Sequence, residues 1–180
     1  MSDTPFKHSH APNCHPAGLS IDRLLQDCDV SRTRASGPGG QHRNKVETAI
    51  RILHRSSGVS TIANERRSQE ENLRVAIGRL RLLLAVNVRS VTSEHVEPSA
   101  LWSSRLRDGR IQCNDRHADF PVMLAEAMDA VDAKSYDVRK AAAALGCSTS
   151  QLIRFIARVP EALQNVNNAR AAAGMHRLQK

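Results

Sequence analysis

The stretch Gly37-Pro38-Gly39-Gly40-Gln41-His42-Arg43-Asn44-Lys45 opens with three glycines and a proline in four positions. Such a run favours neither a helix nor a strand, because glycine reaches positive φ and carries no side chain. We therefore predict a loop that can bring its main chain close to another molecule. Arg32 and Arg34 precede the loop, and Arg43 and Lys45 follow its tip. This cationic stem indicates a polyanionic target, and RNA is the leading candidate.

The residues on both sides of this loop alternate with a period of two, which indicates β-strands. Residues 28–34 form the first predicted strand, with Cys28 and Val30 facing inward. Residues 46–53 form the second strand, and residues 59–63 return as the third after a tight turn at residues 55–58. Gly58 supplies the positive φ that such a turn requires. Two strands joined this closely predict an antiparallel hairpin.

A long amphipathic helix is predicted after the third strand. Ser68 and Glu71 match a capping box, which marks the start of a helix. The apolar residues that follow recur at helical spacing and form one stripe, made of Leu73, Ala76, Ile77, Leu80 and Leu84. Arg67, Arg74 and Arg81 recur at intervals of seven and predict a second, basic stripe. One side of the helix is thus expected to cover the sheet, while another presents arginines.

Two blocks of this sequence resemble the hydrolytic domain of the bacterial-type class I peptide chain release factors. The first block is Ser36 to His42 with Asn44 and Lys45, and the second is Glu65-Arg66-Arg67-Ser68-Gln69 with Asn72. The same signature occurs in ribosome-rescue hydrolases that lack codon-reading domains. The resemblance covers residues 28–86. Two further stretches look more like the short release-factor-like proteins of bacteria: His-Pro-Ala-Gly-Leu at 15–19 and His-Ala-Asp-Phe-Pro at 117–121.

The resemblance implies a ribosome-dependent enzyme that hydrolyses the ester of peptidyl-tRNA in the peptidyl transferase centre of the large subunit, without a cofactor. The catalytic residues would be Gly39, Gly40 and Gln41. The backbone N–H of Gln41 would donate to the developing oxyanion or to the leaving hydroxyl, and would help to place the attacking water. The residues expected to bind ribosomal RNA are Arg34, Ser36, His42, Arg43, Asn44, Lys45, Arg66, Arg67, Gln69 and Asn72. Glu65 is expected to pair with an arginine rather than contact RNA. In this family a methyltransferase can modify the glutamine, which here is Gln41.

A conventional hydrolytic set is absent from the sequence. There is no Gly-x-Ser-x-Gly elbow, and a lone His42 does not make a triad. A zinc site made by His8, His10, Cys14 and His15 is a minor alternative, and no metal is predicted because structural zinc spacing is missing. If the protein is an enzyme, catalysis must come mostly from positioning.

Two other functions stay open. The chain could be a non-catalytic ribosome- or RNA-binding factor that keeps the release-factor fold, or a nucleic-acid-binding regulator that acts through its C-terminal helices. The intact Gly39-Gly40-Gln41 favours the hydrolase, because a pure binding factor has no need of it. Codon-reading segments are not recognisable, so we expect codon-independent release, either in ribosome rescue or in a termination-like reaction. Residues 165–180 are weakly basic for an mRNA-channel tail, which argues against rescue of stalled 70S ribosomes by tail insertion. Rescue on split large subunits needs no such tail and stays open.

The net charge of +8 is concentrated in the segment that contains the loop. Residues 31–90 carry twelve basic and four acidic side chains, whereas residues 1–30 have a net charge of −2 and residues 91–180 of +2. A localised positive field attracts phosphate backbones and makes binding sensitive to salt. Residues 31–90 contain no aromatic side chain, so contacts to phosphate and to RNA shape are expected rather than base stacking.

The cysteines and the hydropathy bear on the compartment. Cys14, Cys28, Cys113 and Cys147 form no Cys-x-x-Cys pair, and no signal peptide is recognisable, so free thiols in a cytoplasmic protein are expected. No apolar run approaches the roughly 18–20 residues that a membrane-spanning helix needs, so no membrane association is expected.

The predicted fold class is α+β. A small antiparallel or mixed sheet carries the Gly-Gly-Gln loop and one packed helix, and an all-helical module follows. We predict a disordered N-terminus (1–18), a release-factor-like catalytic domain (19–88), a connecting segment (89–119) and a C-terminal helical module (120–180). Trp102 is expected to be a packing anchor and residues 107–110 a turn. Asp137 and Ser148 are expected to cap two helices on either side of Gly146, which resembles a helix-turn-helix.

Overall fold

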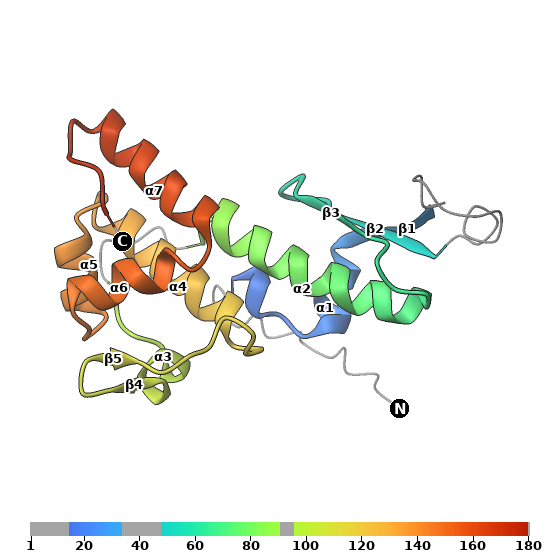
Figure 1. Ribbon diagram of the computed structural model, residues 1–180, viewed down its shortest axis with the longest axis horizontal. Coiled ribbons are helices and arrows are strands. Elements are labelled where there is room, and N and C mark those ends of the chain that lie inside the picture. Colours follow the sequence, from blue (N-terminus) through green and yellow to red (C-terminus); the bar gives the residue numbers. More distant parts are fainter. Residues whose placement is uncertain (1–14, 34–47, 91–95, 180) are drawn as a thin grey trace, which may run out of the picture.

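The computed structural model describes residues 15–33, 48–90 and 96–179, whose elements form an elongated molecule (Figure 1). A three-stranded sheet lies at one end, and the helices α4 to α7 lie at the other. The long helix α2 (Gln69–Asn87) connects the two ends. One continuous set of buried side chains extends from the sheet to α7. The predicted α+β class is confirmed, with a small sheet, one long packed helix and a helical C-terminal part.

The sheet is antiparallel with strand order β1-β2-β3, formed by β1 (Cys28–Thr33), β2 (Ala49–His54) and β3 (Ser60–Ala63). Strand β1 pairs with β2 from Cys28 opposite His54 to Thr33 opposite Ala49. Residues 34–47 therefore connect the two strands at the Thr33–Ala49 end. The predicted turn between β2 and β3 is confirmed, since the Gly58 N–H donates to the His54 carbonyl at 2.9 Å and Gly58 has φ +70°.

Val30 is not buried as predicted: its exposed fraction is 46%. It lies opposite Ile52, which is fully buried, so both side chains project from the same face of the sheet. Helix α2 packs mainly against β2 and β3, however, and β1 is an edge strand. A period of two identifies the face that a side chain occupies but does not show how far the covering helix extends.

Helix α2 begins as predicted. The hydroxyl of Ser68 accepts hydrogen bonds from the backbone N–H groups of Glu70 and Glu71 at 3.2 and 3.5 Å. Four of the five residues of the predicted apolar stripe are buried, while Leu73 is half-buried and packs against the same core. The helix crosses the sheet with its first half and contacts α4 as well.

Residues 15–18, which belong to the stretch predicted to be disordered, are folded against the core, and this corrects the prediction for these four residues. A short 3₁₀ helix, η1 (Pro16–Gly18), packs against α2 and α4, and Ala17 is fully buried. The His15 ring accepts from the Ala17 N–H at 3.1 Å and contacts the Val88 carbonyl at 3.1 Å. Helix α1 (Ile21–Gln26) follows, with Ser20 as its N-cap. Residues 1–14, including three of the four residues of the zinc alternative, lie outside the described residues.

The connecting segment is an integral part of the core. It contains α3 (Ala100–Ser104) and a small hairpin of β4 (Leu106–Arg107) and β5 (Arg110–Ile111). The predicted turn is confirmed, with φ +49° at Asp108 and +71° at Gly109. Trp102 is fully buried, and its indole N–H donates to the Leu145 carbonyl at 2.8 Å. The predicted packing anchor is therefore also confirmed.

The C-terminal part consists of α4 (Phe120–Ala133), α5 (Val138–Ala144), α6 (Thr149–Ile156) and α7 (Pro160–Ala172). Asp137 and Ser148 cap α5 and α6, and Gly146 between them has φ +68°. The predicted helix, glycine, turn and capped helix are thus present. In the ranges that the structure describes, no helix is both long and apolar enough to cross a bilayer.

Candidate RNA-contacting site

The loop that carries the predicted catalytic residues joins β1 to β2. Residues 34–47 lie outside the described residues, and with them nine of the predicted site residues: Arg34, Ser36, Gly39, Gly40, Gln41, His42, Arg43, Asn44 and Lys45. The two ends of the loop are described. Thr33 is paired with Ala49 in the sheet, so the loop leaves and returns on neighbouring strands of one antiparallel ladder.

Asn72 ties the end of this loop to the start of α2. Its Nδ2 donates to the carbonyl oxygens of Thr48 at 2.7 Å and Arg66 at 3.0 Å. Its Oδ1 accepts from the backbone N–H of Arg66 at 2.9 Å. The side chain is fully buried, and these bonds satisfy both ends of its amide, so its burial costs little. Three segments thus meet at one asparagine: the loop end, the β3–α2 connection and the helix.

This geometry corrects the prediction that Asn72 contacts RNA. A fully buried amide that is already hydrogen-bonded on both sides has no surface to offer to an RNA strand. The burial could have been read from the sequence, because Asn72, Ala76, Leu80 and Leu84 lie four residues apart on one stripe. An asparagine on the apolar stripe of a helix is expected to bind backbone groups of a neighbouring segment.

The other predicted site residues of the second block lie at the start of α2. Arg66 and Arg67 are exposed, and Gln69 is half-buried at the first position of the helix. The N-terminal end of a helix has a positive potential, which adds to the charge of the two guanidinium groups. Since Asn72 holds the Arg66 backbone and the Thr48 carbonyl, these cations are close to the loop end.

The predicted pairing of Glu65 with an arginine is confirmed. Its carboxylate forms an ion pair with Arg79, which also donates to the Ile62 carbonyl at 2.8 Å. The hydrogen bond from Arg79 lowers the pKa of Glu65. The pair joins β3, the connection and α2, so it supports the same corner that Asn72 holds.

The predicted basic stripe of Arg67, Arg74 and Arg81 is only partly available to a partner. Arg74 is exposed and pairs with Glu70 at 2.5 Å. Arg81 instead turns toward the N-terminal segment and donates to the Leu19 carbonyl at 2.5 Å. The spacing of seven places Arg74 and Arg81 on one face of the helix, whereas Arg67 precedes the N-cap Ser68. It does not show that Arg81 is bonded to the N-terminal segment.

The described residues contain no group of three or more His, Cys, Asp or Glu side chains that could hold a metal ion. The described thiols are not activated either: burial raises the pKa of Cys28, Cys113 and Cys147, the last to about 11. A thiol with a raised pKa is a poor nucleophile at neutral pH.

Comparison with known proteins agrees with this arrangement. The RF-1 domain model matches residues 19–120. The chain is 38% identical over 96 residues to the chloroplastic peptide chain release factor PrfB1 of Arabidopsis thaliana, covering 50% of this chain and 21% of that protein. It is 43% identical over 72 residues to a peptide chain release factor homolog of Escherichia coli, covering 40% and 32%. It is 31% identical over 137 residues to peptide chain release factor 1 of Acidiphilium cryptum, covering 66% and 39%.

These matches span between about a fifth and two fifths of the length of the relatives. The matched domain extends past residue 88 to the start of α4, which agrees with a core that continues across that position. The paired sequence blocks lie inside the matched residues, and the match covers more than half of the chain. The chain belongs to the RF-1 domain family, the family of the class I peptide chain release factors and their homologues.

Proposed function

We propose that this protein is a ribosome-dependent peptidyl-tRNA hydrolase that releases nascent chains without reading a codon. The observation that carries the proposal is the combination of Gly39-Gly40-Gln41 with membership of the RF-1 domain family. The described geometry supports it, because both ends of residues 34–47 are anchored. Thr33 and Ala49 are paired in the sheet, and Thr48 is bonded to Asn72.

The reaction is the hydrolysis of the ester between the nascent peptide and the terminal ribose of the tRNA. Water adds to the ester carbonyl carbon, and the bond from that carbon to the ribose oxygen breaks. The proton that the water loses passes to the ribose oxygen, which leaves as a hydroxyl group, and the peptide leaves with a free carboxyl group. The backbone N–H of Gln41 would donate to the oxyanion that develops on this path. One such donor contributes roughly a 10²–10³-fold increase in rate.

Glycine at positions 39 and 40 serves the approach of the backbone to the ester. A β-carbon there would restrict the backbone and separate the Gln41 N–H from its target. The Gln41 side chain would have a secondary role, excluding other nucleophiles, and a glutamine methyltransferase is a proposed partner. The protein alone should hydrolyse nothing, because the peptidyl transferase centre binds the substrate and completes the active site.

The exposed cations at the start of α2 would hold the protein on ribosomal RNA. Arg66 and Arg67 suit phosphate contacts, because guanidinium groups bind phosphate in a bidentate manner. Together with Gln69 and the loop residues Arg34, Ser36, His42, Arg43, Asn44 and Lys45 they form the proposed RNA-binding set. Asn72 belongs to the support of this site and not to its surface. We infer that the protein acts in the cytoplasm, although one of its relatives is chloroplastic.

The test is release of labelled peptide from ribosomes that hold peptidyl-tRNA. Stop, sense and empty A sites and isolated large subunits would be compared, each with wild type and Gly40→Ala. The proposal predicts release that does not depend on the codon and disappears in the variant. Firm ribosome binding without release from any complex would overturn it and leave a non-catalytic binding factor.

A further inference from the structure

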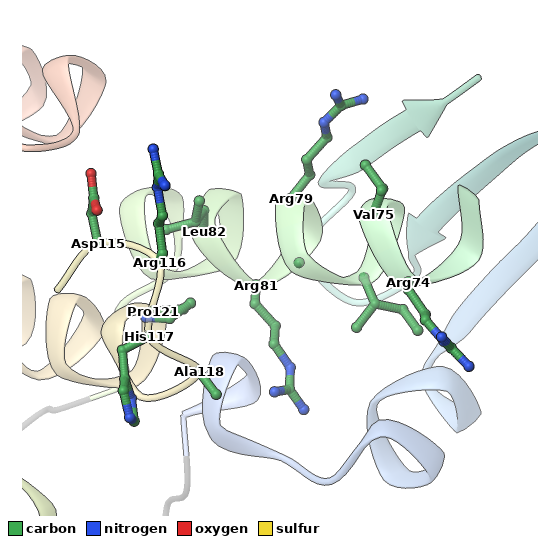
Figure 2. Close-up of a pocket in the computed structure, with 12 residues that line it drawn as sticks. Arg74, Val75, Arg79, Arg81, Leu82, Asp115, Arg116, His117, Ala118 and Pro121 are labelled. Atoms are coloured by element: carbon green, nitrogen blue, oxygen red, sulfur yellow. The ribbon is translucent and has the colours of Figure 1, made fainter. Parts of the chain in front are cut away.

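A groove of about 420 Å³ lies between the exposed side of α2 and the segment that leads into α4. Figure 2 shows its walls: side chains of α2 on one side, and Arg116, His117 and Pro121 from the other segment. Its lining is largely apolar and includes Gly78 in the middle of α2, together with Val75 and Leu82 of the same helix.

Arginines dominate the lining of this groove. Asp115 is the one acidic residue among the lining residues, against Arg74, Arg79, Arg81 and Arg116. Arg116 is exposed, and its guanidinium has no hydrogen-bond or ion-pair partner among the residues that the structure describes. Arg74 and its partner Glu70 are both more than 70% exposed, and such a pair is weak enough to be exchanged for a phosphate.

Gly78 has no structural reason to be a glycine. It lies in the interior of a 19-residue helix, where glycine is less favourable than alanine. Its φ is not in the positive range, and a β-carbon built on it would meet no atom within 4 Å. Neither the helix nor the packing of the described residues therefore requires this residue. A bare stretch of backbone in the lining of a cationic groove does, however, let a partner approach the helix closely.

We propose that this groove binds the phosphodiester backbone of an RNA strand. The phosphates would contact Arg116 and Arg74 at the rim, and a ribose would lie over Gly78. No Phe, Tyr or Trp lines the groove, so binding would rest mainly on phosphate contacts and not on the base sequence. The identification of that strand as ribosomal RNA rests on the proposed function.

Two observations favour RNA over an acidic protein segment. Planar guanidinium groups spaced along a groove match successive phosphates of a strand. The groove also lies along α2, the helix that Arg66 and Arg67 directly precede in the chain, so one RNA strand or two neighbouring strands would cover both the connection before the helix and the groove. An acidic protein segment is the alternative that the experiment must separate.

The experiment measures binding of the full-length protein to purified large ribosomal subunits as a function of salt. Arg116→Glu and Gly78→Glu should weaken binding about tenfold or more, and Arg116→Ala should reduce the slope of log affinity against log salt by about 1. Arg139 is an exposed residue on α5, and Arg139→Glu is the matched control with the same charge change. This control should bind like wild type. Groove variants that bind within twofold of wild type would overturn the proposal.

Gly78→Ala separates docking from folding. It should unfold at the same or a higher temperature than wild type, because alanine favours the helix and the β-carbon has free space. It should nevertheless bind large subunits several-fold more weakly. Binding equal to wild type would show that nothing approaches the helix at Gly78.

A crosslinking experiment identifies the occupant. A p-benzoylphenylalanine in place of Leu82 should crosslink to ribosomal RNA when the protein is bound to large subunits. Crosslinks to a ribosomal protein alone would overturn RNA as the occupant.

Peptide release, measured with the wild-type protein and the groove variants, distinguishes failure of the groove proposal from failure of the proposed function. If the wild-type protein binds through the groove but releases no peptide, only the proposed function is refuted. If the groove variants bind normally and release peptide, only the proposed role of the groove is refuted.

Discussion

The Nδ2 of Asn72 donates a 2.7 Å hydrogen bond to the carbonyl oxygen of Thr48, 24 residues earlier in the chain. Through this bond helix α2 holds the residue that directly follows the Gly-Gly-Gln loop. The same amide exchanges two hydrogen bonds with the Arg66 backbone. The loop end and the cations at the helix start therefore share one buried anchor, and several predictions test its role.

Asn72→Ala removes this anchor and leaves three backbone groups of Thr48 and Arg66 without their partner. Each unpaired buried group costs about 1–3 kcal/mol, so we expect a loss of unfolding free energy in the range of about 2 kcal/mol or more. Urea unfolding measures it. Peptide release at saturating protein should fall while binding to large subunits changes less, because Asn72 positions the loop without contacting RNA. Asn168 is an exposed residue on α7, and Asn168→Ala is the control that should change neither the unfolding free energy nor the rate of peptide release. Wild-type release by Asn72→Ala would show that the anchor does not position the loop.

Arg66→Ala and Arg67→Ala should weaken binding to large subunits without changing stability. Each removes one exposed cation, so the slope of log affinity against log salt should fall by about 1 per variant. The measurement is a salt titration of binding. Lys140→Ala removes an equally exposed charge far along the chain and should leave the slope unchanged. A salt slope that responds equally to all three variants would indicate nonspecific attraction rather than an oriented site.

Arg89 and Asp129 form a buried link between the end of α2 and α4. The two side chains are 3.1 Å apart, with exposed fractions of 23% and 4%. The Asp129 carboxylate also accepts from the Ser90 hydroxyl at 2.7 Å. Arg89→Met leaves a buried carboxylate without its counter-ion and should cost about 3–5 kcal/mol in urea unfolding. The double variant Arg89→Met/Asp129→Leu should recover part of that loss, and no recovery would show that the pair is not the source of the cost.

His15 should make the stability depend on pH. Burial lowers its pKa below the ordinary 6.5, although the hydrogen bond to the Val88 carbonyl and the carboxylate of Asp129 act in the opposite direction. Between the lowered folded pKa and 6.5 the unfolded chain binds more protons than the folded one, so stability falls as pH decreases through this window. Thermal unfolding at pH 5.5 and 7.5 should show the difference, and His15→Gln should reduce it. If the unfolding temperature of His15→Gln changes between pH 5.5 and 7.5 as much as that of the wild type, another group causes the pH dependence.

Local patterns predicted the start and the core-facing side of α2, the turn at Gly58 and the role of Trp102. Each of these depends on residues close in sequence: a cap with the following N–H groups, a positive φ, or one large side chain that must be buried. The α+β class followed from the same patterns, and the family from two motif blocks. This much of the fold was predictable because neighbours along the chain determine it.

The errors concern contacts between distant segments. Val30 is exposed because α2 does not extend over the edge strand, and Arg81 is partly covered because η1 and α1 pack beside it. Residues 15–18 are ordered because Ala17 fits between α2 and α4. The resemblance implied an RNA contact for Asn72 because this residue belongs to the second motif block. Its position on the buried stripe was the better guide.

In the proposed mechanism the main chain at residues 39–41 performs the chemistry. The decisive measurement is single-turnover peptide release from large subunits that carry peptidyl-tRNA, with Gly40→Ala and Gln41→Ala compared at saturating protein. Gly40→Ala should lose roughly 10²-fold or more in rate, as expected for a displaced oxyanion donor. Gln41→Ala should retain much more activity, because its backbone N–H remains. Full activity of Gly40→Ala, or an equal loss in both variants, would show that the main chain does not perform the chemistry.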